Sequence, residues 1–472
     1  MERTIIKEAF IFTIFGASGD LAKLKIFPAI YELAWQKRLP KNYIIYGYAR
    51  SEKTDEQFRK EFETSVKEKF GKEIDVTILE DMLSKVFYFA GQYNEKNDYE
   101  KFFKKLKEKE TNSNTPLIAY YSTPPTVFND ISRNLAEFKN EFPMRLVIEK
   151  PFGENEASAR DMFAIIEENF EEDQVYLLDH YLGKESVQSI TSMRYANSII
   201  NHLLKGELIK YIQITGIENI GIKERGKYFD EVGMIKDMIQ SHLLQLLALI
   251  TMSMPNNLNS QSIHREKYHI LSALKFDKEN FLIKGQYESY KNEDEIAIDS
   301  KTETYAALKL CIDQTEWAEV PIYIRTGKMV DRKHTYITIV FKKLHFQEAI
   351  KDLKHNKLII ELQPKANVYF KITNKHGGTY EEYHQMAPSQ SLECFGDDCL
   401  PEHGRLLMDI LKDERRHFLS FNEVIACWHF IDNVLNEAKN QNLPLEIYKD
   451  GSRGPNGQNI LLGEENNVWH EI

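Results

Sequence analysis

A histidine in a strongly apolar stretch of the sequence has carboxylates near it and could act as a general base. His242 follows Asp237 in this stretch, and Glu218 and Glu231 precede both residues. An imidazole that titrates near neutral pH is suited to removing a proton from a hydroxyl group, and a carboxylate beside it would stabilise the resulting imidazolium. A histidine on an apolar helix can also be a core residue that takes no part in catalysis. The spacing does not identify the partner carboxylate.

A second polar cluster, DHYLGKE, follows the apolar residues Val175–Leu178 and contains a lysine among neutral hydrogen-bond donors. A helical turn would bring His180, Tyr181 and Lys184 onto one face, where they could converge on one anion. A lysine together with neutral donors is suited to binding a phosphate group. The alternative is a helix start that Asp179 caps, with Lys184 in solvent beyond it.

A glycine-rich turn joins the apolar run Ala9–Phe15 to a helical pattern. Glycines in such a turn let peptide N–H groups and the helix amino terminus approach a pyrophosphate. The spacing is G-x-x-G-x-x-A rather than G-x-G-x-x-G, so a simple connection between strand and helix is the alternative. We predict that the turn binds a dinucleotide through Gly16, Ser18, Gly19, Asp20 and Leu21.

The next predicted strand ends in Tyr48-Ala49-Arg50-Ser51 and bears on the choice of dinucleotide. Folds of this kind that use NAD place an acidic residue there for the ribose 2′-hydroxyl. A guanidinium and a hydroxyl suit a 2′-phosphate instead, so Arg50 and Ser51 favour NADP over NAD. The alternative is that Arg50 is a solvated loop residue.

A basic run follows a later strand and has two interpretations. It consists of Arg325-Thr326-Gly327-Lys328, followed by Arg332, Lys333 and His334. The run is either a solvated loop or a cap over a phosphorylated ligand. The sequence contains no HxxxH or cysteine pair with ligand spacing, no GxSxG elbow and no G-K-[ST] loop, so we expect neither a required metal nor a serine hydrolase.

The elements that must position these groups change in character near residue 180. Before it, short apolar runs alternate with helical stretches, including two charged ones at Phe58–Phe70 and Tyr99–Lys109. The predicted strands are Ala9–Phe15, Tyr43–Tyr48, Val86–Ala90, Leu117–Ser122 and Arg145–Glu149. Strands separated by helices predict a doubly wound parallel sheet, which is an α/β, Rossmann-like dinucleotide-binding domain at residues 1–180.

After residue 180, strands follow one another without intervening helices. They are predicted at Leu208–Asn219, Glu303–Ile312, Ile322–Arg325, Tyr336–Phe341, Lys357–Leu362 and Asn367–Ile372. Helical stretches at Ser186–Asn201, Gly233–Met254, Arg405–Leu411 and Phe421–Glu437 would cover the sheet. This pattern predicts an α+β domain at residues 181–472 with a mainly antiparallel sheet.

Composition excludes several classes of protein. The chain of 472 residues has 61 lysines and arginines against 72 acidic residues, a formal net charge of −11, which argues against a general nucleic-acid binder. Four cysteines in so long a chain make no disulfide framework and indicate a reducing compartment. The most apolar stretch, His242–Met254, is too short to span a bilayer, and the first residues contain no cleavage site. We therefore expect a cytoplasmic protein with no membrane partner.

The motifs together resemble those of the glucose-6-phosphate dehydrogenase family. The resemblance spans nearly the whole chain and includes GASGDLAKLKIFPAI, YGYARS, YYSTPP, IEKPFG, DHYLGKE, RGKYFDEVGMIKDMIQSHLLQ, KGQY, SKTETYAALKL, PIYIRTGK and GSRGPNGQNILL. It implies NADP-linked oxidation of glucose 6-phosphate to a 6-phospho-gluconolactone, the first step of the oxidative pentose phosphate pathway. It also implies that residues 181–472 bind substrate and mediate dimerisation, in a homodimer or a dimer of dimers.

The resemblance assigns roles that the spacing leaves open. His242 matches the general base that takes the proton of the C1 hydroxyl while C1 gives hydride to the nicotinamide, and Asp179 matches the carboxylate that orients it. His180, Tyr181 and Lys184 match the phosphate grip. The matched sugar ligands are Lys150, Glu218, Asp237, Lys328, Arg332 and Gln363. Lys150 and Pro151 also match residues beside the nicotinamide. Glu361 stands where relatives with a second, structural NADP carry an arginine, and a carboxylate there argues against that second site.

Overall fold

The apolar runs of the first part of the chain form a six-stranded parallel sheet. The computed structural model describes residues 4–110, 112–350, 353–375, 383–394, 396, 398–463 and 467–471. The strands are β1 (Phe10–Phe15), β2 (Tyr43–Ala49), β3 (Val86–Ala90), β4 (Leu117–Tyr121), β5 (Met144–Glu149) and β6 (Val175–Leu178), in the order β3-β2-β1-β4-β5-β6. All neighbours pair in parallel. The predicted doubly wound sheet is confirmed.

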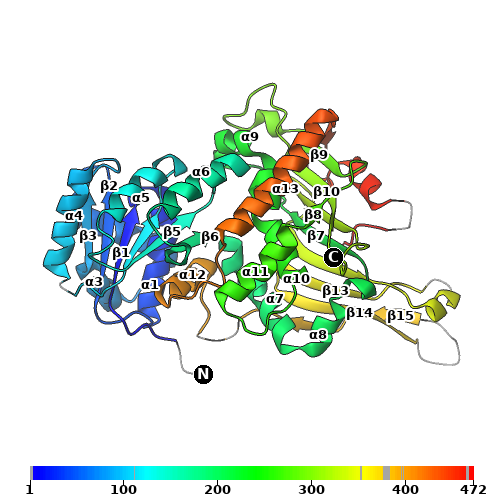
Figure 1. The fold of residues 1–472 in the computed structure, drawn as a ribbon, viewed down its shortest axis with the longest axis horizontal. Helices are drawn as coiled ribbons and strands as arrows, with labels where there is room; N and C mark the ends of the chain where they lie inside the picture. The colour runs from blue at the N-terminus through cyan, green and yellow to red at the C-terminus, as the bar shows by residue number, and fades with distance from the viewer. Residues whose placement is uncertain are drawn as a thin grey trace. The chain divides into compact units, whose positions relative to one another are not determined.

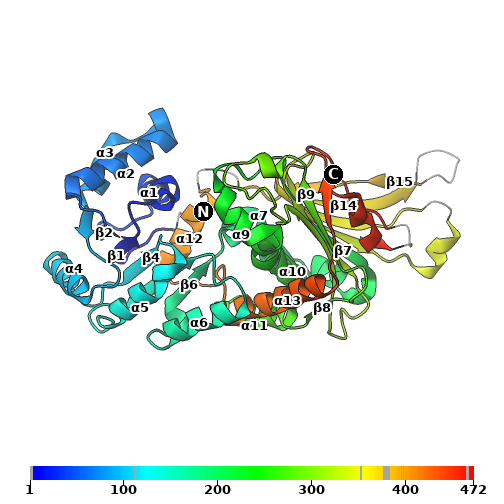
Figure 2. The same cartoon turned by 90° about the horizontal axis from the view of Figure 1, so that it is seen from above.

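Helices cover both faces of this sheet, as Figure 2 shows. One face carries α1 (Phe27–Trp35), α2 (Asp55–Phe70) and α3 (Val76–Ser84), and the other carries α4 (Lys96–Lys109), α5 (Phe128–Ala136) and α6 (Glu156–Glu167). The chain divides into two compact units, of which the first runs to Lys184. It also takes in a much later segment that contains α12 (Glu402–Leu411) and ends at Phe421.

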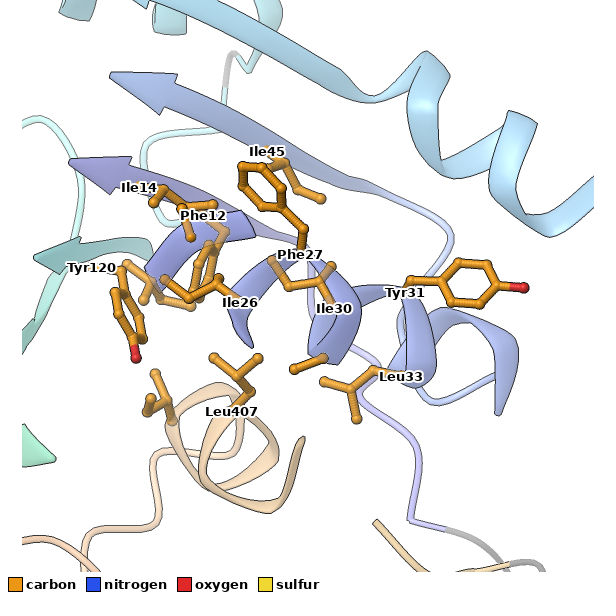
Figure 3. Packing of buried hydrophobic residues seen from close by; sticks show 14 of the residues in the cluster. Phe12, Ile14, Ile26, Phe27, Ile30, Tyr31, Leu33, Ile45, Tyr120 and Leu407 are labelled. Atoms are coloured by element: carbon orange, nitrogen blue, oxygen red, sulfur yellow. The ribbon is translucent and has the colours of Figure 1, made fainter. Parts of the chain in front are cut away.

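Helix α12 completes the core of the first unit. Leu407 of α12 lies against α1 in the same buried cluster as Phe12 of β1 and Ile30 of α1 (Figure 3). The Arg405 side chain donates a hydrogen bond from Nε to the carbonyl oxygen of Gly183, over 2.9 Å. The sequence predicts the helix itself, but the expectation that it covers the larger sheet is wrong, because its apolar side packs on α1 in the first unit.

An eleven-stranded sheet organises the second unit. Its strands are β7 (Ile209–Ile217), β8 (Leu274–Lys275), β9 (Leu282–Tyr287), β10 (Tyr305–Ile312), β11 (Ile322–Gly327), β12 (His334–Phe341), β13 (Lys357–Gln363), β14 (Asn367–Lys375), β15 (Tyr383–Met386), β16 (Ser389–Ser391) and β17 (Leu445–Tyr448). The pairs β7–β11 and β9–β17 are parallel. The other pairs are antiparallel. The predicted mainly antiparallel sheet is confirmed.

Helices lie over one face of this sheet (Figure 1). They are α7 (Glu185–Ala196), α8 (Ser198–Leu203), α9 (Gly226–Met234), the π-helix η8 (Ile235–Leu243), α10 (Leu244–Thr251), α11 (Ser260–Leu271) and α13 (Phe421–Asn440). The single helix expected at Ser186–Asn201 is two helices, because the backbone of Asn197 is extended (φ −124°, ψ 102°). No helix in the described ranges combines the length and the hydrophobicity that crossing a bilayer requires.

The last residues of the chain pack on the opposite face of the larger sheet. The guanidinium carbon of Arg325, on β11, lies 4.6 Å from the ring centre of Trp469. Arg325 also donates to Thr215 Oγ1 over 3.1 Å and to Gln458 Oε1 over 3.2 Å. The side chain of Gln213 donates to the carbonyl oxygen of Val468 over 2.9 Å. This end of the chain is therefore part of the fold of the second unit.

Candidate active site

The candidate dinucleotide residues lie at the carboxyl edge of the parallel sheet. Gly16 follows β1, Arg50 follows β2, and Lys150 and Pro151 follow β5. The order of strands along the chain reverses between β1 and β4, which are neighbours in the sheet. Open sheets of this type bind ligands at such a reversal.

The turn after β1 requires a glycine at its first position. Gly16 has φ +84°, and a Cβ atom built on it would lie 2.2 Å from the carbonyl oxygen of Ser122. Its N–H donates to the carbonyl oxygen of Tyr48 over 2.8 Å. The helix begins at Asp20, so the N–H groups of Asp20 and Leu21 belong to the first turn, where a helix offers no acceptor of its own. The turn therefore fits a pyrophosphate group.

Arg50 lines a pocket of about 540 Å³. Its guanidinium carbon is 5.7 Å from the ring centre of Tyr93. Burial raises the pKa of Tyr93, and the charge of Arg50 opposes that rise. The carbonyl oxygen of Ser51 accepts a hydrogen bond from the hydroxyl of Tyr88 over 2.6 Å. Arg50 and Ser51 are both exposed, so they are accessible to a ligand.

The end of β5 holds a carboxylate that the sequence analysis did not single out. Glu149 precedes Lys150, whose peptide bond to Pro151 is cis. The hydroxyl of Tyr120 donates a hydrogen bond to the Glu149 carboxylate. Burial raises the pKa of Glu149, while that hydrogen bond and the charge of Lys150 act against the rise. Its signal was present in the motif IEKPFG, where an acid ends a buried strand.

The DHYLGKE segment follows β6 as a short 3-10 turn, His180–Gly183. Asp179 caps this turn, because its Oδ1 accepts from the N–H of Tyr181 over 2.9 Å. Asp179 is 1% exposed. The Lys184 ammonium lies 3.4 Å from the ring centre of Tyr181 and is half-buried, so it is not the fully solvated lysine of the simpler interpretation. The rings of His180 and Tyr181 lie 5.6 Å apart.

Four candidate sugar ligands lie at one edge of the larger sheet, the side where strands β7, β11 and β13 end and β12 begins. Glu218 follows β7, Lys328 follows β11, Arg332 precedes β12, and Gln363 ends β13. These strands are neighbours in the order β13-β12-β7-β11. The register pairs Ile217 with Gly327 and with His334, and pairs Thr335 with Gln363. Residues that are far apart in the sequence therefore meet at this edge.

Hydrogen bonds already organise this edge. Lys328 Nζ and Glu218 Oε2 are 2.6 Å apart. The Arg332 guanidinium donates to both oxygens of Asp331, over 3.0 and 2.7 Å. This contact with Arg332 holds the pKa of Asp331 below its ordinary value. Thr335 Oγ1 and Gln363 Oε1 are 3.5 Å apart.

The basic run of the sequence serves different purposes along its length. Arg325 is buried under the end of the chain, whereas Lys328 and Arg332 lie at the sheet edge. Lys333 is exposed, and the buried His334 pairs with Glu361, with 2.7 Å between Nε2 and Oε1. Neither the loop interpretation nor the phosphate-cap interpretation describes the whole run.

Asp237 and His242 both lie on the π-helix η8, and both are buried. A π-helix forms hydrogen bonds between residues i and i+5, and such helices are frequent at functional sites. The N–H of Leu244 accordingly bonds to the carbonyl oxygen of Ile239. Two side chains at this spacing, Asp237 and His242, share one side of the helix.

Glu303 holds the start of η8 and was also missed by the sequence analysis. Its Oε1 accepts from the N–H of Ile235 over 3.1 Å, and its carbonyl oxygen accepts from the N–H of Met234 over 3.0 Å. Gly233 has φ +72°, and a Cβ there would lie 2.5 Å from Glu303 Oε1. Burial raises the pKa of Glu303, and its hydrogen bond from Ile235 opposes the rise.

Comparisons with known proteins match the whole chain. The model for the NAD binding domain of glucose-6-phosphate dehydrogenase matches residues 13–189, and the model for its C-terminal domain matches residues 191–470. The glucose-6-phosphate 1-dehydrogenase of Chlamydia muridarum (strain MoPn / Nigg) is 33% identical, over 97% of this chain and 96% of that relative. That of Buchnera aphidicola subsp. Acyrthosiphon pisum (strain APS) is 33% identical, over 97% of each chain. A solved glucose-6-phosphate dehydrogenase in complex with its substrate glucose-6-phosphate superposes with a TM-score of 0.91 at 30% identity, over 100% of both chains.

Proposed function

This chain belongs to the glucose-6-phosphate dehydrogenase family, and we propose that it carries out the family's reaction with NADP as the hydride acceptor. It oxidises glucose 6-phosphate to 6-phospho-glucono-1,5-lactone. The observation that carries the proposal is the match of both family models over nearly the whole chain. The gathering of the candidate dinucleotide residues at the carboxyl edge of the first sheet, and of four candidate sugar ligands at one edge of the larger sheet, supports the choice of ligands.

His242 is the general base in this proposal. A bound nicotinamide dinucleotide would accept the hydride that leaves C1 of the sugar. The imidazole of His242 takes the proton of the C1 hydroxyl, and C1 releases its hydrogen with both bonding electrons as the C1–O bond becomes the lactone carbonyl. Proton removal places electron density on the oxygen, so it favours departure of the hydride. His242 is 2% exposed, which limits competition from bulk water.

Asp179 is the positioning carboxylate of this base. A carboxylate beside an imidazole fixes its tautomer and stabilises the imidazolium that forms. The N–H of Tyr181 fixes one oxygen of Asp179, so the orientation of the carboxylate is set before substrate binds. The remaining sugar contacts are assigned to Lys150, Glu218, Asp237, Lys328, Arg332 and Gln363.

Replacement of Lys184 by glutamine tests the phosphate grip, which we assign to His180, Tyr181 and Lys184. Glutamine keeps a donor but removes the charge, and charge-assisted hydrogen bonds are about twice as strong as neutral ones. We expect the KM for glucose 6-phosphate to rise about 10–100-fold and the KM for NADP to stay within about twofold. Initial rates at varied sugar phosphate give the result, with Lys205→Gln as the matched surface control. Equal effects of the two variants would contradict the assignment.

Replacement of Arg50 by alanine tests the cofactor. The 2′-phosphate of NADP would lose its guanidinium partner, whereas the 2′-hydroxyl of NAD would lose little. We expect kcat/KM to fall about 10–100-fold with NADP and less than about threefold with NAD. Parallel rate measurements with both cofactors decide this. An equal fall with both would mean that Arg50 does not contact the 2′-phosphate.

The activity itself is tested by following nicotinamide reduction with glucose 6-phosphate, with glucose and other hexose phosphates as controls. Rapid reduction of NADP with glucose 6-phosphate alone is the expected outcome. Turnover of unphosphorylated glucose at a similar rate would overturn the phosphate grip. A homodimer or dimer of dimers, a cytoplasmic location and a place at the start of the oxidative pentose phosphate pathway remain predictions.

A further inference from the structure

Glu52 lies between two pockets at the dinucleotide edge of the first unit. The pocket of about 540 Å³ contains Arg50 and the end of β3. A second pocket of about 750 Å³ contains Asp20 and Lys23, next to the glycine-rich turn. Among the residues that line these two pockets, Glu52 is the one that both share. A dinucleotide whose pyrophosphate lies at the turn and whose adenosine ribose lies at Arg50 would therefore pass this carboxylate.

The charges around Glu52 do not all favour an added phosphate. Arg50 shares its pocket with three lysines of α4, Lys101, Lys104 and Lys105, and with three acids, Glu52, Asp98 and Glu108. Asp98 is engaged locally, because its Oδ1 lies 3.2 Å from Lys101 Nζ and its Oδ2 accepts from the N–H of Gln92 over 2.9 Å. Glu52 is exposed and only two positions from Arg50. Of these three acids, Glu52 is the one nearest in the sequence to Arg50, the predicted 2′-phosphate ligand.

A carboxylate at this place acts in opposite directions on the two cofactors. A 2′-phosphate carries a charge of roughly −1.5 to −2 and is repelled. A free 2′-hydroxyl can instead donate a hydrogen bond to the carboxylate, which is how NAD-binding folds use an acid after their second strand. Arg50 alone would favour NADP strongly, and an acid in the same pocket reduces that preference.

We propose that Glu52 is a specificity-determining residue that weakens the preference for NADP and permits binding of NAD. The inference rests on the proposed assignment of Arg50 to the 2′-phosphate. In this proposal the end of β2 carries two groups of opposite charge: Arg50 binds the 2′-phosphate of NADP, and Glu52 accepts a hydrogen bond from the ribose 2′-hydroxyl of NAD.

Glu52→Gln tests this inference, with Glu56→Gln as its matched control. Both residues are exposed and lose the same charge, but Glu56 lies in the first turn of α2 and lines neither pocket. We expect Glu52→Gln to lower the Kd for NADPH about three- to tenfold and to leave the Kd for NADH equal or up to about threefold higher. Fluorescence titration of the purified full chain with each reduced cofactor gives both constants without turnover. The ratio of kcat/KM for NADP over NAD should rise by the same factor.

Each outcome separates this inference from the cofactor assignment. A change in the NADPH:NADH ratio no larger than that of Glu56→Gln overturns the role of Glu52. If Arg50→Ala lowers NADPH affinity while Glu52→Gln has no effect, the cofactor assignment stands and the present inference fails. If neither Arg50→Ala nor Glu52→Gln changes the ratio of the NADPH and NADH affinities, the 2′-substituent lies elsewhere. The assignment of Arg50 and the role of Glu52 are then both wrong. If Glu52→Gln increases the preference for NADPH over NADH by a factor that becomes smaller at high salt, the result supports electrostatic repulsion between Glu52 and the 2′-phosphate.

Discussion

Replacing His242 by asparagine lowers kcat about 10²–10⁴-fold, while the KM for glucose 6-phosphate changes less than about threefold, because a general base typically contributes that factor to rate alone. Asparagine can fill the space of the imidazole and keep a hydrogen bond, but it cannot accept the C1 proton. Rapid-mixing rates and direct titration of sugar phosphate binding separate the two effects. The fall in rate toward acid pH, where the base is protonated, should disappear in the variant.

His269→Asn is the matched control for this prediction. His269 also lies in the second unit, on α11, but its side chain is 53% exposed. The control should retain full turnover and the acid limb of the pH profile. If His242→Asn retained full turnover, the assignment of the base would be wrong, whatever the control shows.

Replacing Lys267 by methionine lowers the free energy of unfolding of the second unit by about 3–5 kcal/mol, the usual cost of leaving one member of a buried ion pair alone. Lys267 Nζ lies 2.6 Å from Glu423 Oε2, with side-chain exposures of 1% and 0%. Lys267 also donates to Gln245 Oε1 over 3.1 Å. The pair thus joins α11 and α13 to α10, the helix that continues η8. Urea unfolding followed by fluorescence gives the loss.

Two further variants test the cause of that loss. Lys267→Met combined with Glu423→Gln removes both charges and should recover most of the stability, since no uncompensated ion remains in the core. Lys275→Met breaks the exposed pair with Asp313 and should leave the midpoint unchanged. If Lys267→Met alone were as stable as the parent chain, the buried ion pair would make no net contribution to the free energy of unfolding.

Many strand positions in both units follow from local apolar runs and are predictable from the sequence, but six strands of the structure were not predicted: β6, β8, β9, β15, β16 and β17. The run at Val86–Ala90 gave the limits of β3, because a strand buried on both faces carries its own pattern. Helix limits are less local. The pattern at Ser186–Asn201 is continuous, yet the chain turns at Asn197, whose backbone is extended and whose side-chain amide donates to the carbonyl oxygen of Met193 over 2.9 Å. Asparagine side chains can replace the backbone bonds of a helix in this way, and the apolar pattern does not show it.

The candidate site is predictable only in part, for a similar reason. The motif containing Lys328 and Arg332 marks a basic run, but the strand register decides which of its members reach the sheet edge and that Arg325 is buried. Glu149 accepts from Tyr120 of β4, and Glu303 accepts from Ile235 at the start of η8. Both partners are distant in the sequence, so the residues around each acid do not reveal these contacts. The π-helical winding between Asp237 and His242 leaves no signature in the spacing of apolar residues.

The late return of α12 to the first unit sets a constraint on synthesis of this protein. Arg405 bonds to Gly183, 222 positions earlier in the chain, and Leu407 covers α1. The strands and helices of residues 1–184 are synthesised well before α12, which covers part of their apolar surface. While most of the second unit is being translated, the apolar surface of α1 that α12 covers in the folded protein therefore stays exposed. During this interval the nascent chain depends on protection from association with its neighbours.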